Sequence, residues 1–254
     1  MRLPPRLTDP VAASLLARMS AVEWRLLREP AETGRRNMER DEALLAAAAR
    51  EALPPTLRFY AWNPPAVSLG RFQDAEGINR EYAAQRGWDV VRRPTGGRGV
   101  LHQFEVTYSI TLPPSVVGGS GVRAGYAVLV GALNAGLREL LGASPETPEP
   151  TSERCGPRSR RAANCFALAA ECDTLAPGGK LVGSAQVRRG GALLQHGSIL
   201  LDLEPEAWTA LFGDPGRPVS LRGLLGTAPA REEVEQAVIA GFERWGIRFG
   251  HPEG

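Results

Sequence analysis

The chain has 254 residues, 43% of them hydrophobic and 23% charged, a composition typical of globular proteins and not of collagen, coiled coils or disordered chains. Its net charge of +2 is too small to indicate nucleic-acid binding. Three cysteines without a C-x-x-C pair argue against a disulfide scaffold or a structural zinc site, and no window reaches the roughly 18 apolar residues of a membrane span. We therefore expect a soluble, cytoplasmic protein with no metal site and no nucleic-acid or membrane partner.

The first half of the chain carries both strand and helix patterns. In order they predict a strand over 23–27, a helix over 37–50, strands over 57–62 and 66–69 joined by a turn at 63–65, and a strand over 90–93. The helix over 37–50 places Met38, Asp41 and Leu44 on related faces. Asn79 is a suitable cap for a further helix that runs to Arg86.

The second half predicts a longer strand, two helices and a hairpin. In order these are a half-buried strand over 106–112, a helix over 124–141 that ends at Gly142, an exposed loop over 143–163, two strands within 180–203 and a helix over 231–245. Gly190 and Gly191 separate the two strands, and both positions of a tight hairpin tolerate positive φ. No repeat or linker divides the chain, so we expect one domain over 1–254 with a core over about 22–248.

The segment RRPTGGRGVLH, residues 92–102, is the first candidate binding element. Gly96 and Gly97 allow the loop to fold tightly over a bound group, and the arginines beside them suit an anionic or carbonyl ligand. Arg92 and Arg93 end a strand, so one of them can point into a site and the other away from it. The alternative is a glycine turn between two strands.

The segment GKLVGSAQ, residues 179–186, followed by LQHGSILL, residues 194–201, is the second candidate. Lys180 lies on the strand that enters Gly183, where the missing side chain would let a ligand approach the backbone. The ammonium could hold a carbonyl or phosphate oxygen. The alternatives are an edge lysine of a hairpin and, for His196, a core histidine with satisfied hydrogen bonds.

Cys165 is the candidate nucleophile, and it lies between an arginine-rich loop and the Lys180 strand. A thiol needs nearby positive charge to react as a thiolate at neutral pH, and Lys180 or the loop could supply it. Burial as a small hydrophobic residue is the alternative for Cys165 and for Cys172. The loop carries Arg154, Arg158, Arg160 and Arg161, which either form a solvated surface or steer an acidic partner.

Several long motifs in this order resemble the biotin/lipoate protein ligase catalytic family. They are NMERDEALL near 37–45, WNPPAVSLGRFQ at 62–73, RRPTGGRGVLH, the Cys-Phe pair at 165–166, and GKLVGSAQ followed by LQHGSILL. Within the family the chain is most similar to the cysteine-dependent octanoyl-[acyl carrier protein]:protein N-octanoyltransferases. The resemblance implies an α+β fold with a mixed, largely antiparallel sheet flanked by helices.

The resemblance also implies a ping-pong acyl transfer in lipoate biosynthesis that needs no cofactor. Cys165 would take octanoyl from acyl carrier protein as a thioester, and Lys180 would polarise the acyl carbonyl. A lysine of a lipoyl-domain protein, such as the glycine cleavage H protein or a 2-oxoacid dehydrogenase E2, would then accept the octanoyl group. The implied substrate-binding residues are Arg92, Arg93, Thr95, Gly96, Gly97, Arg98, His102, Gly183, Ser184, Gln186, His196 and Gly197.

This sequence departs from the family pattern near the cysteine. Relatives follow the Cys-Phe pair with Pro-Ser and then Tyr-Glu, where this chain has Ala169-Ala170 and Cys172-Asp173, and Gln103 replaces a common acidic residue. Three alternatives therefore stay open. They are an ATP- and Mg-dependent lipoate ligase, an amidotransferase between lipoyl proteins, and a non-catalytic acyl-binding protein. The loop reads TGGR instead of the three-glycine version typical of ligases, which disfavours the first alternative.

Overall fold

The computed structural model describes residues 7–147, 164–167 and 172–250. Its strands are β1 (Glu23–Glu32), β2 (Thr56–Trp62), β3 (Ala66–Leu69), β4 (Asp89–Arg92), β5 (Val100–His102), β6 (Glu105–Leu112), β7 (Thr174–Ala176), β8 (Gly179–Arg189), β9 (Ala192–Leu200) and β10 (Arg248–Phe249). Its helices are α1 (Pro10–Ser20), α2 (Gly34–Ala48), α3 (Arg80–Gln85), α4 (Pro114–Val117), α5 (Val122–Leu141), α6 (Pro205–Phe212), α7 (Leu221–Leu225) and α8 (Arg231–Arg244), with 3-10 turns η1 (Ala75–Gly77) and η2 (Cys165–Ala167).

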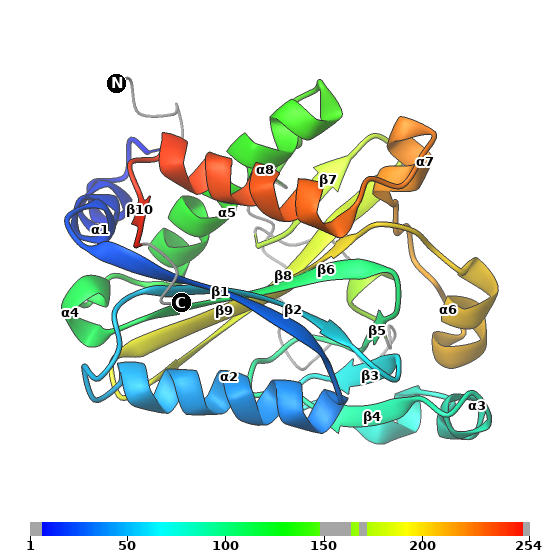
Figure 1. The fold of residues 1–254 in the computed structure, drawn as a ribbon. Coiled ribbons are helices and arrows are strands. Elements are labelled where there is room, and N and C mark those ends of the chain that lie inside the picture. Colours follow the sequence, from blue (N-terminus) through cyan, green and yellow to red (C-terminus); the bar gives the residue numbers. More distant parts are fainter. Residues whose placement is uncertain (1–6, 148–163, 168–171, 251–254) are drawn as a thin grey trace.

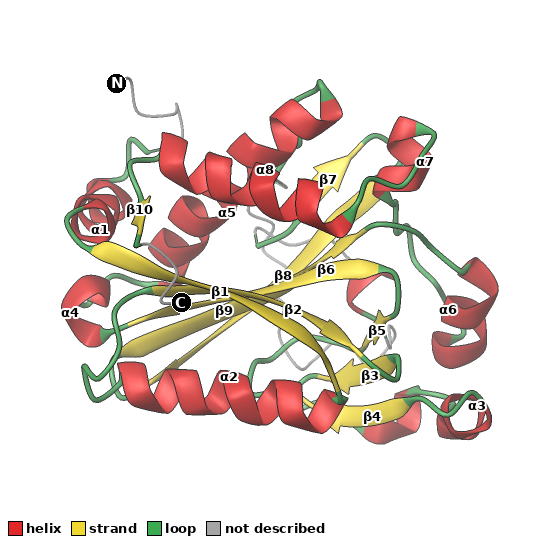
Figure 2. Cartoon of the chain, viewed as in Figure 1, coloured by secondary structure: helices red, strands yellow, loops and turns green. Residues whose placement is uncertain are grey.

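Two sheets organise the fold (Figure 1; strands are yellow in Figure 2). The larger sheet has the strand order β10-β1-β2-β6-β9-β8-β7. In it β1 runs parallel to both β10 and β2, and every later neighbouring pair is antiparallel. The smaller sheet has the order β4-β3-β5, with β3 parallel to β4 and antiparallel to β5. The prediction of an α+β fold with a mixed, largely antiparallel sheet is confirmed.

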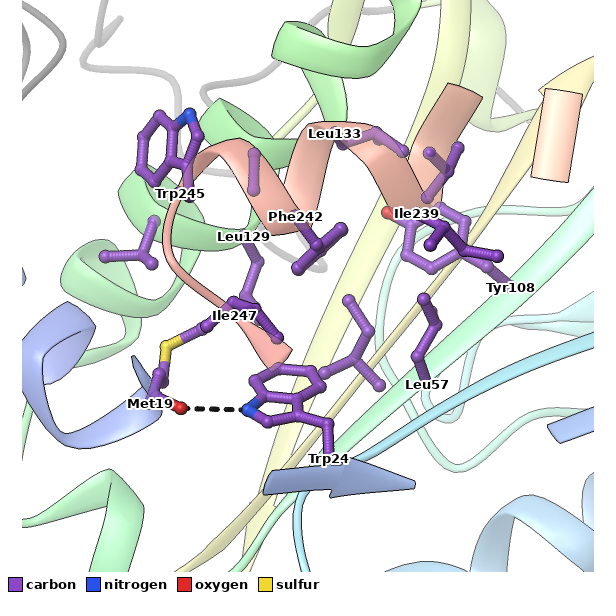
Figure 3. Close-up of a cluster of buried hydrophobic side chains, with 14 of the residues drawn as sticks. Met19, Trp24, Leu57, Tyr108, Leu129, Leu133, Ile239, Phe242, Trp245 and Ile247 are labelled. Carbon is purple, nitrogen blue, oxygen red and sulfur yellow. Dashed lines mark hydrogen bonds between the residues drawn. The ribbon is translucent and has the colours of Figure 1, made fainter. Parts of the chain in front are cut away.

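Helices cover both faces of the larger sheet (Figure 1). On one face Leu45 and Ala48 of α2 pack against Leu194 of β9. On the other face α1, α5 and α8 enclose the main core with side chains from β2, β6 and β9. Figure 3 shows part of this core, where the indole nitrogen of Trp24 donates to the carbonyl of Met19 at 3.0 Å. Across the described ranges, no helix combines the length and apolar composition needed to cross a membrane.

Several boundaries follow from local chemistry, as the sequence predicts. The side chain of Asn79 accepts from the backbone N–H of Tyr82 and caps α3. Gly142 ends α5 at φ 62°, and Gly190 and Gly191 form the turn between β8 and β9 at φ 56° and 79°. Because these positive φ values strain residues with a side chain, glycine fixes where the helix ends and where the hairpin turns.

The prediction of a half-buried strand over 106–112 is wrong, because every residue of β6 is buried. The alternation of apolar and polar residues on which the prediction rests does place alternate residues on opposite faces of β6. Val106, Tyr108 and Ile110 enter the main core, while the hydroxyl of Ser109 donates to Asp41 of α2 at 2.8 Å. The polar face of β6 thus packs beneath α2 instead of facing water, and it supplies part of a buried polar layer.

The crossing of α5 and α8 depends on glycine at position 136. A Cβ added to Gly136 would overlap the backbone carbonyl of Ala237 on α8. We expect Gly136→Ala to lower the free energy of unfolding by about 1 to 3 kcal/mol, because a backbone contact cannot move aside as a side chain can. Gly223→Ala is the matched control, since the nearest atom to its Cβ would lie 3.6 Å away. Urea unfolding of both variants tests this, and equal stability would contradict it.

Candidate active site

A hollow that is partly open to solvent lies where the two sheets meet, and residues of both sheets line it. It is lined by residues of α2, η2 and six strands that are distant in sequence, and by one residue of the segment that follows β4. They are Met38, Tyr60, Trp62, Ser68, Arg93, Val100, His102, Thr107, Cys165, Gly183, Ser184, Ala185, His196, Gly197 and Ser198. Both predicted glycine motifs and the Cys-Phe pair therefore contribute to one site.

Cys165 is held at the wall of this hollow by its own backbone. Its N–H donates to the carbonyl of Gly99, at the end of the first glycine motif, at 2.8 Å. Asn164, which precedes it, is buried, donates to the carbonyl of Asp214, and accepts from the N–H of Phe166 at 2.8 Å. The backbone of Cys165 is thus held beside the glycine loop, which places the cysteine at the wall of the hollow.

Lys180 lies next to Cys165 and is only 3% exposed. Its Nζ lies 3.4 Å from Cys165 Sγ and 2.8 Å from the carbonyl oxygen of the same residue. It also lies 2.7 Å from Asp173 Oδ2. Burial by itself would lower the pKa of Lys180, but the neighbouring charges of Cys165 and Asp173 outweigh it and raise the pKa above its ordinary value. The ammonium therefore stays charged at neutral pH.

Gly183 faces this pair. A Cβ at Gly183 would lie 3.3 Å from the Lys180 side chain and 3.6 Å from Cys165 Sγ, so the absent side chain leaves room for both groups against the strand. Gly197, opposite on β9, is tighter, because its Cβ would come within 2.7 Å of the Gly183 carbonyl. The two glycines let β8, β9 and the Cys165 turn approach closely.

The two arginines of the first motif have different places. Arg93 is buried, and its guanidinium donates to the carbonyls of Gly96 and Arg98 at 2.8 and 2.7 Å, which folds the glycine loop around it. Burial lowers the pKa of Arg93 from its ordinary value. Arg92 is exposed and binds the carbonyls of Gly70, Arg71 and Gln73. Arg93 therefore points inward and Arg92 outward, the alternation expected of a strand end.

Arg93 also anchors two buried hydrogen-bond chains that end on carboxylates. In the first, it donates to Thr95 Oγ1 at 3.1 Å, which lies 2.6 Å from His196 Nε2, while His196 Nδ1 lies 3.0 Å from Asp41 Oδ2. Since the carboxylate can only accept, His196 donates from Nδ1 and accepts from the threonine hydroxyl. Burial lowers the pKa of His196, so the ring is neutral at pH 7.

The second chain runs through the other histidine. Arg93 donates to Ser68 Oγ at 3.2 Å, Ser68 Oγ lies 2.8 Å from His102 Nε2, and His102 Nδ1 contacts Glu105. The indole of Trp62 stacks on the His102 ring at 4.0 Å. The same carboxylate argument makes His102 a donor to Glu105 and an acceptor from Ser68. Both histidines of the hollow therefore have their nitrogens occupied by protein groups.

The predicted site residues divide into two groups. Seven line the hollow, and they are Arg93, His102, Cys165, Gly183, Ser184, His196 and Gly197. The other seven lie behind that wall or beside it, and they are Arg92, Thr95, Gly96, Gly97, Arg98, Lys180 and Gln186. The side-chain amide of Gln186 does not face the hollow. It donates to the amide oxygen of Gln195 on the neighbouring strand β9 at 2.7 Å.

Sequence reasoning missed several polar residues of the site. Asp41 is fully buried and joins α2 to His196 and Arg58. The sequence does contain an indication of this role. Asp41 is a carboxylate within the apolar stripe of a predicted helix, and a buried carboxylate is unfavourable unless it has a partner. Asp173 pairs with Lys180 although it appears in the sequence only as a departure from the family pattern. Glu105 pairs with His102, three residues before it, a short spacing that the sequence contains but that residue types alone did not mark as a buried pair.

Two predicted features cannot be placed. The arginine cluster at 154–161 and the Ala169-Ala170 departure lie outside the described residues. Cys172 is described and buried, and its Sγ lies 3.7 Å from Asp173 Oδ1. Within the same described ranges, no three His, Cys, Asp or Glu side chains are grouped to hold a metal ion.

Comparison with known proteins identifies the family. A model of the lipoyl protein ligase A/B catalytic domain matches residues 33–243. An octanoyltransferase LipM from Kyrpidia tusciae is 42% identical and covers 89% of this chain and 88% of its own length. Another from Moorella thermoacetica is 44% identical over 81% and 75%. The fold matches a T. acidophilum lipoate protein ligase with bound lipoic acid, at 23% identity and TM-score 0.69, over 90% of this chain and 88% of that one. The chain belongs to the lipoyl protein ligase A/B catalytic domain family, as the motifs predict.

Proposed function

We propose that this chain transfers an octanoyl group from acyl carrier protein, through a thioester on Cys165, to a lysine of a lipoyl-domain protein in lipoate biosynthesis. The octanoyltransferase activity follows from the relatives of that name, which align with most of this chain. The thioester route rests on one observation, the position of Lys180 Nζ 3.4 Å from the sulfur of Cys165 at the wall of the hollow. An ammonium at this distance stabilises negative charge on sulfur, and the thiolate is the reactive form.

In the first half-reaction the thiolate of Cys165 attacks the carbonyl of the donor thioester. The C–S bond to the donor breaks, the donor thiol leaves with the proton that Cys165 gave up, and octanoyl remains on Cys165. Negative charge passes through the carbonyl oxygen during the attack. Lys180 is the nearby cation that can stabilise this charge, a contribution that is large in a buried site.

In the second half-reaction the neutral amine of the acceptor lysine attacks the octanoyl thioester on Cys165. An amide bond forms, the C–S bond breaks, and the proton lost by the amine returns to the sulfur. The thioester supplies the energy of the amide bond, so this route needs neither ATP nor another cofactor. Acyl carrier protein as donor and the lipoyl domain as acceptor are parts of the proposal that the experiment below tests separately.

The hollow suits a hydrocarbon chain because its polar atoms are already paired. Ser184 Oγ lies 2.8 Å from the hydroxyl of Tyr108, and Trp62 donates to Thr107 at 2.8 Å. With both histidines also occupied, the wall presents the carbon surfaces of Met38 and Val100 and of the aromatic rings. Burying each methylene of octanoyl there contributes about 0.8 kcal/mol.

Intact-protein mass spectrometry tests the route. We expect wild type mixed with octanoyl-acyl carrier protein, without ATP, to gain an octanoyl mass that hydroxylamine removes. Cys165→Ser is expected to gain none, because an alkoxide is not formed at neutral pH beside this ammonium, and the matched control Cys155→Ser is expected to gain the same mass as wild type. Peptide mapping then assigns the adduct to Cys165.

The other outcomes separate the alternatives. Transfer from free octanoate that requires ATP, with no adduct beforehand, would establish a ligase and reject the thioester. An adduct formed only from an octanoylated lipoyl protein would establish an amidotransferase. Reversible octanoate binding without any covalent step would leave an acyl-binding protein.

A further inference from the structure

The ammonium of Lys180 has all its donors engaged. Lysine carries three N–H donors and no acceptor. The three partners within reach of Nζ are Asp173 Oδ2 at 2.7 Å, the Cys165 carbonyl at 2.8 Å and Cys165 Sγ at 3.4 Å. Two of these partners do not react, and the third is the nucleophile itself. Lys180 therefore offers only one N–H to the reaction, and the other two contacts decide where it points.

The direction of this N–H matters for the chemistry described above. Once Cys165 carries an acyl group, its sulfur loses its charge and becomes a weak acceptor. The N–H that faced sulfur is then available to the acyl oxygen, which lies two bonds from the sulfur. The contacts to Asp173 and to the Cys165 carbonyl do not change, so Nζ keeps its position while its third donor changes partner.

Asp173 is itself fixed in this position. It is 1% exposed, and its second oxygen, Oδ1, accepts from the N–H of Ser184 at 3.4 Å. The next residue, Thr174, is anchored to α5 through a 2.6 Å hydrogen bond from its hydroxyl to Asn134. The carboxylate is therefore tied to β8 and the residue after it to α5, which restricts the movement of a lysine bound to this carboxylate.

We propose that Asp173 is a positioning residue of the acyl transfer, which holds the Lys180 ammonium so that its remaining N–H faces the sulfur and then the acyl oxygen. This inference rests on the proposed thioester route and deepens it. The groups whose charges act on Lys180 are Cys165, Asp173 and Cys172, and the ring of Phe166 lies 5.1 Å from Nζ. Among these groups, only the carboxylate of Asp173 is negatively charged both before and after Cys165 is acylated.

Asp173→Asn tests this because it keeps the shape and removes the charge. We expect the rate of thioester formation to fall about 100-fold with the donor KM unchanged, since the ammonium is displaced and not the acyl pocket. The pH profile should also change. The charge of Asp173 raises the pKa of Lys180 against burial, which lowers it, so the variant should lose activity on the alkaline side at a lower pH than wild type.

Two control variants make the result decisive. Asp202→Asn removes a carboxylate that pairs with Arg222 at the surface, and it should leave rate and pH profile unchanged. Asp173→Glu restores the charge one methylene further out, and it should recover part of the rate and the wild-type alkaline limb. If the asparagine variant does not fold, the glutamate variant decides alone, because a merely structural carboxylate would give either the full wild-type rate or no folded protein.

A wild-type rate and pH profile in Asp173→Asn would overturn the inference. This failure is distinguishable from failure of the proposed function. If wild type itself forms no octanoyl adduct, the thioester route fails. If wild type forms the adduct and Asp173→Asn forms it equally fast, only the role of Asp173 fails.

Discussion

Replacing Lys180 with methionine is expected to slow octanoyl transfer by roughly 10²- to 10³-fold, the usual effect of removing one donor that stabilises an oxyanion. Methionine fills similar space without a charge or a donor. The loss should appear in single-turnover formation of the thioester, measured by quenched-flow mass spectrometry, because the ammonium lies against the sulfur that attacks. An unchanged single-turnover rate would contradict the role given to Lys180.

The same substitution is expected to destabilise the protein, and this must be separated from the chemistry. Lys180→Met removes the 2.7 Å ion pair of the buried Asp173 carboxylate, and breaking a buried pair by removing one partner is expected to lower the free energy of unfolding by up to about 3 to 5 kcal/mol. The double variant Lys180→Met with Asp173→Asn removes both charges and should regain most of that stability. It should remain as slow as the single variant, so urea unfolding and single-turnover rates together distinguish a folding defect from a catalytic one.

The secondary structure was predictable where short-range chemistry decides it. The hairpin at Gly190-Gly191, the Asn79 cap and the end of α5 at Gly142 all rest on residues within one turn of each other. Helix α1 was not predicted, although Asp9 caps it by accepting from the N–H of Val11. Ala12, Leu15, Leu16 and Met19 have the i, i+3, i+4, i+7 spacing of a helix and are all buried, so this helix was within reach of the sequence and was overlooked.

Which strands pair with one another was harder to predict from the sequence. The pattern predicts strands over 57–62 and 66–69 joined by a turn, and both exist, but they lie in different sheets. The cause is that β2 already has β1 on one edge and β6 on the other, so β3 must find other partners and pairs with β4 and β5. No property of the 57–69 segment itself contains that information.

The candidate site shows the same division. Glycine-rich motifs, Cys165 and Lys180 could be recognised from residue types, and the structure brings them together around one hollow. The buried hydrogen-bond networks could not be recognised in this way, because they join residues that are far apart in the sequence, as Asp41 is from His196. Buried polar residues must be paired, and sequence reveals which residues need partners but not which partners they find.

Asp41→Ala is expected to lower the free energy of unfolding by about 1 to 3 kcal/mol, because it removes the 2.8 Å acceptor of the buried Arg58 guanidinium, which keeps its ion pair with Glu29. It also removes the acceptor of Ser109 and the carboxylate that fixes the His196 ring. The neighbouring Glu42 is exposed on the same helix, so Glu42→Ala is the matched control and should change stability by less than about 0.5 kcal/mol. Urea unfolding at pH 7 measures both.

The pH dependence identifies the carboxylate as the cause. Burial opposes ionisation of Asp41, but the hydrogen bond from His196 and the charge of Arg58 outweigh it and lower its pKa below the ordinary 3.8. A depressed folded-state pKa stabilises the protein above the unfolded value, and this contribution is lost as pH falls through the folded value. The part of the stability difference between wild type and Asp41→Ala that comes from this carboxylate should therefore be fully present above pH 3.8 and shrink as the pH falls below it. A difference that persists unchanged in acid would mean that lost packing, and not the charge of Asp41, holds α2 to the site.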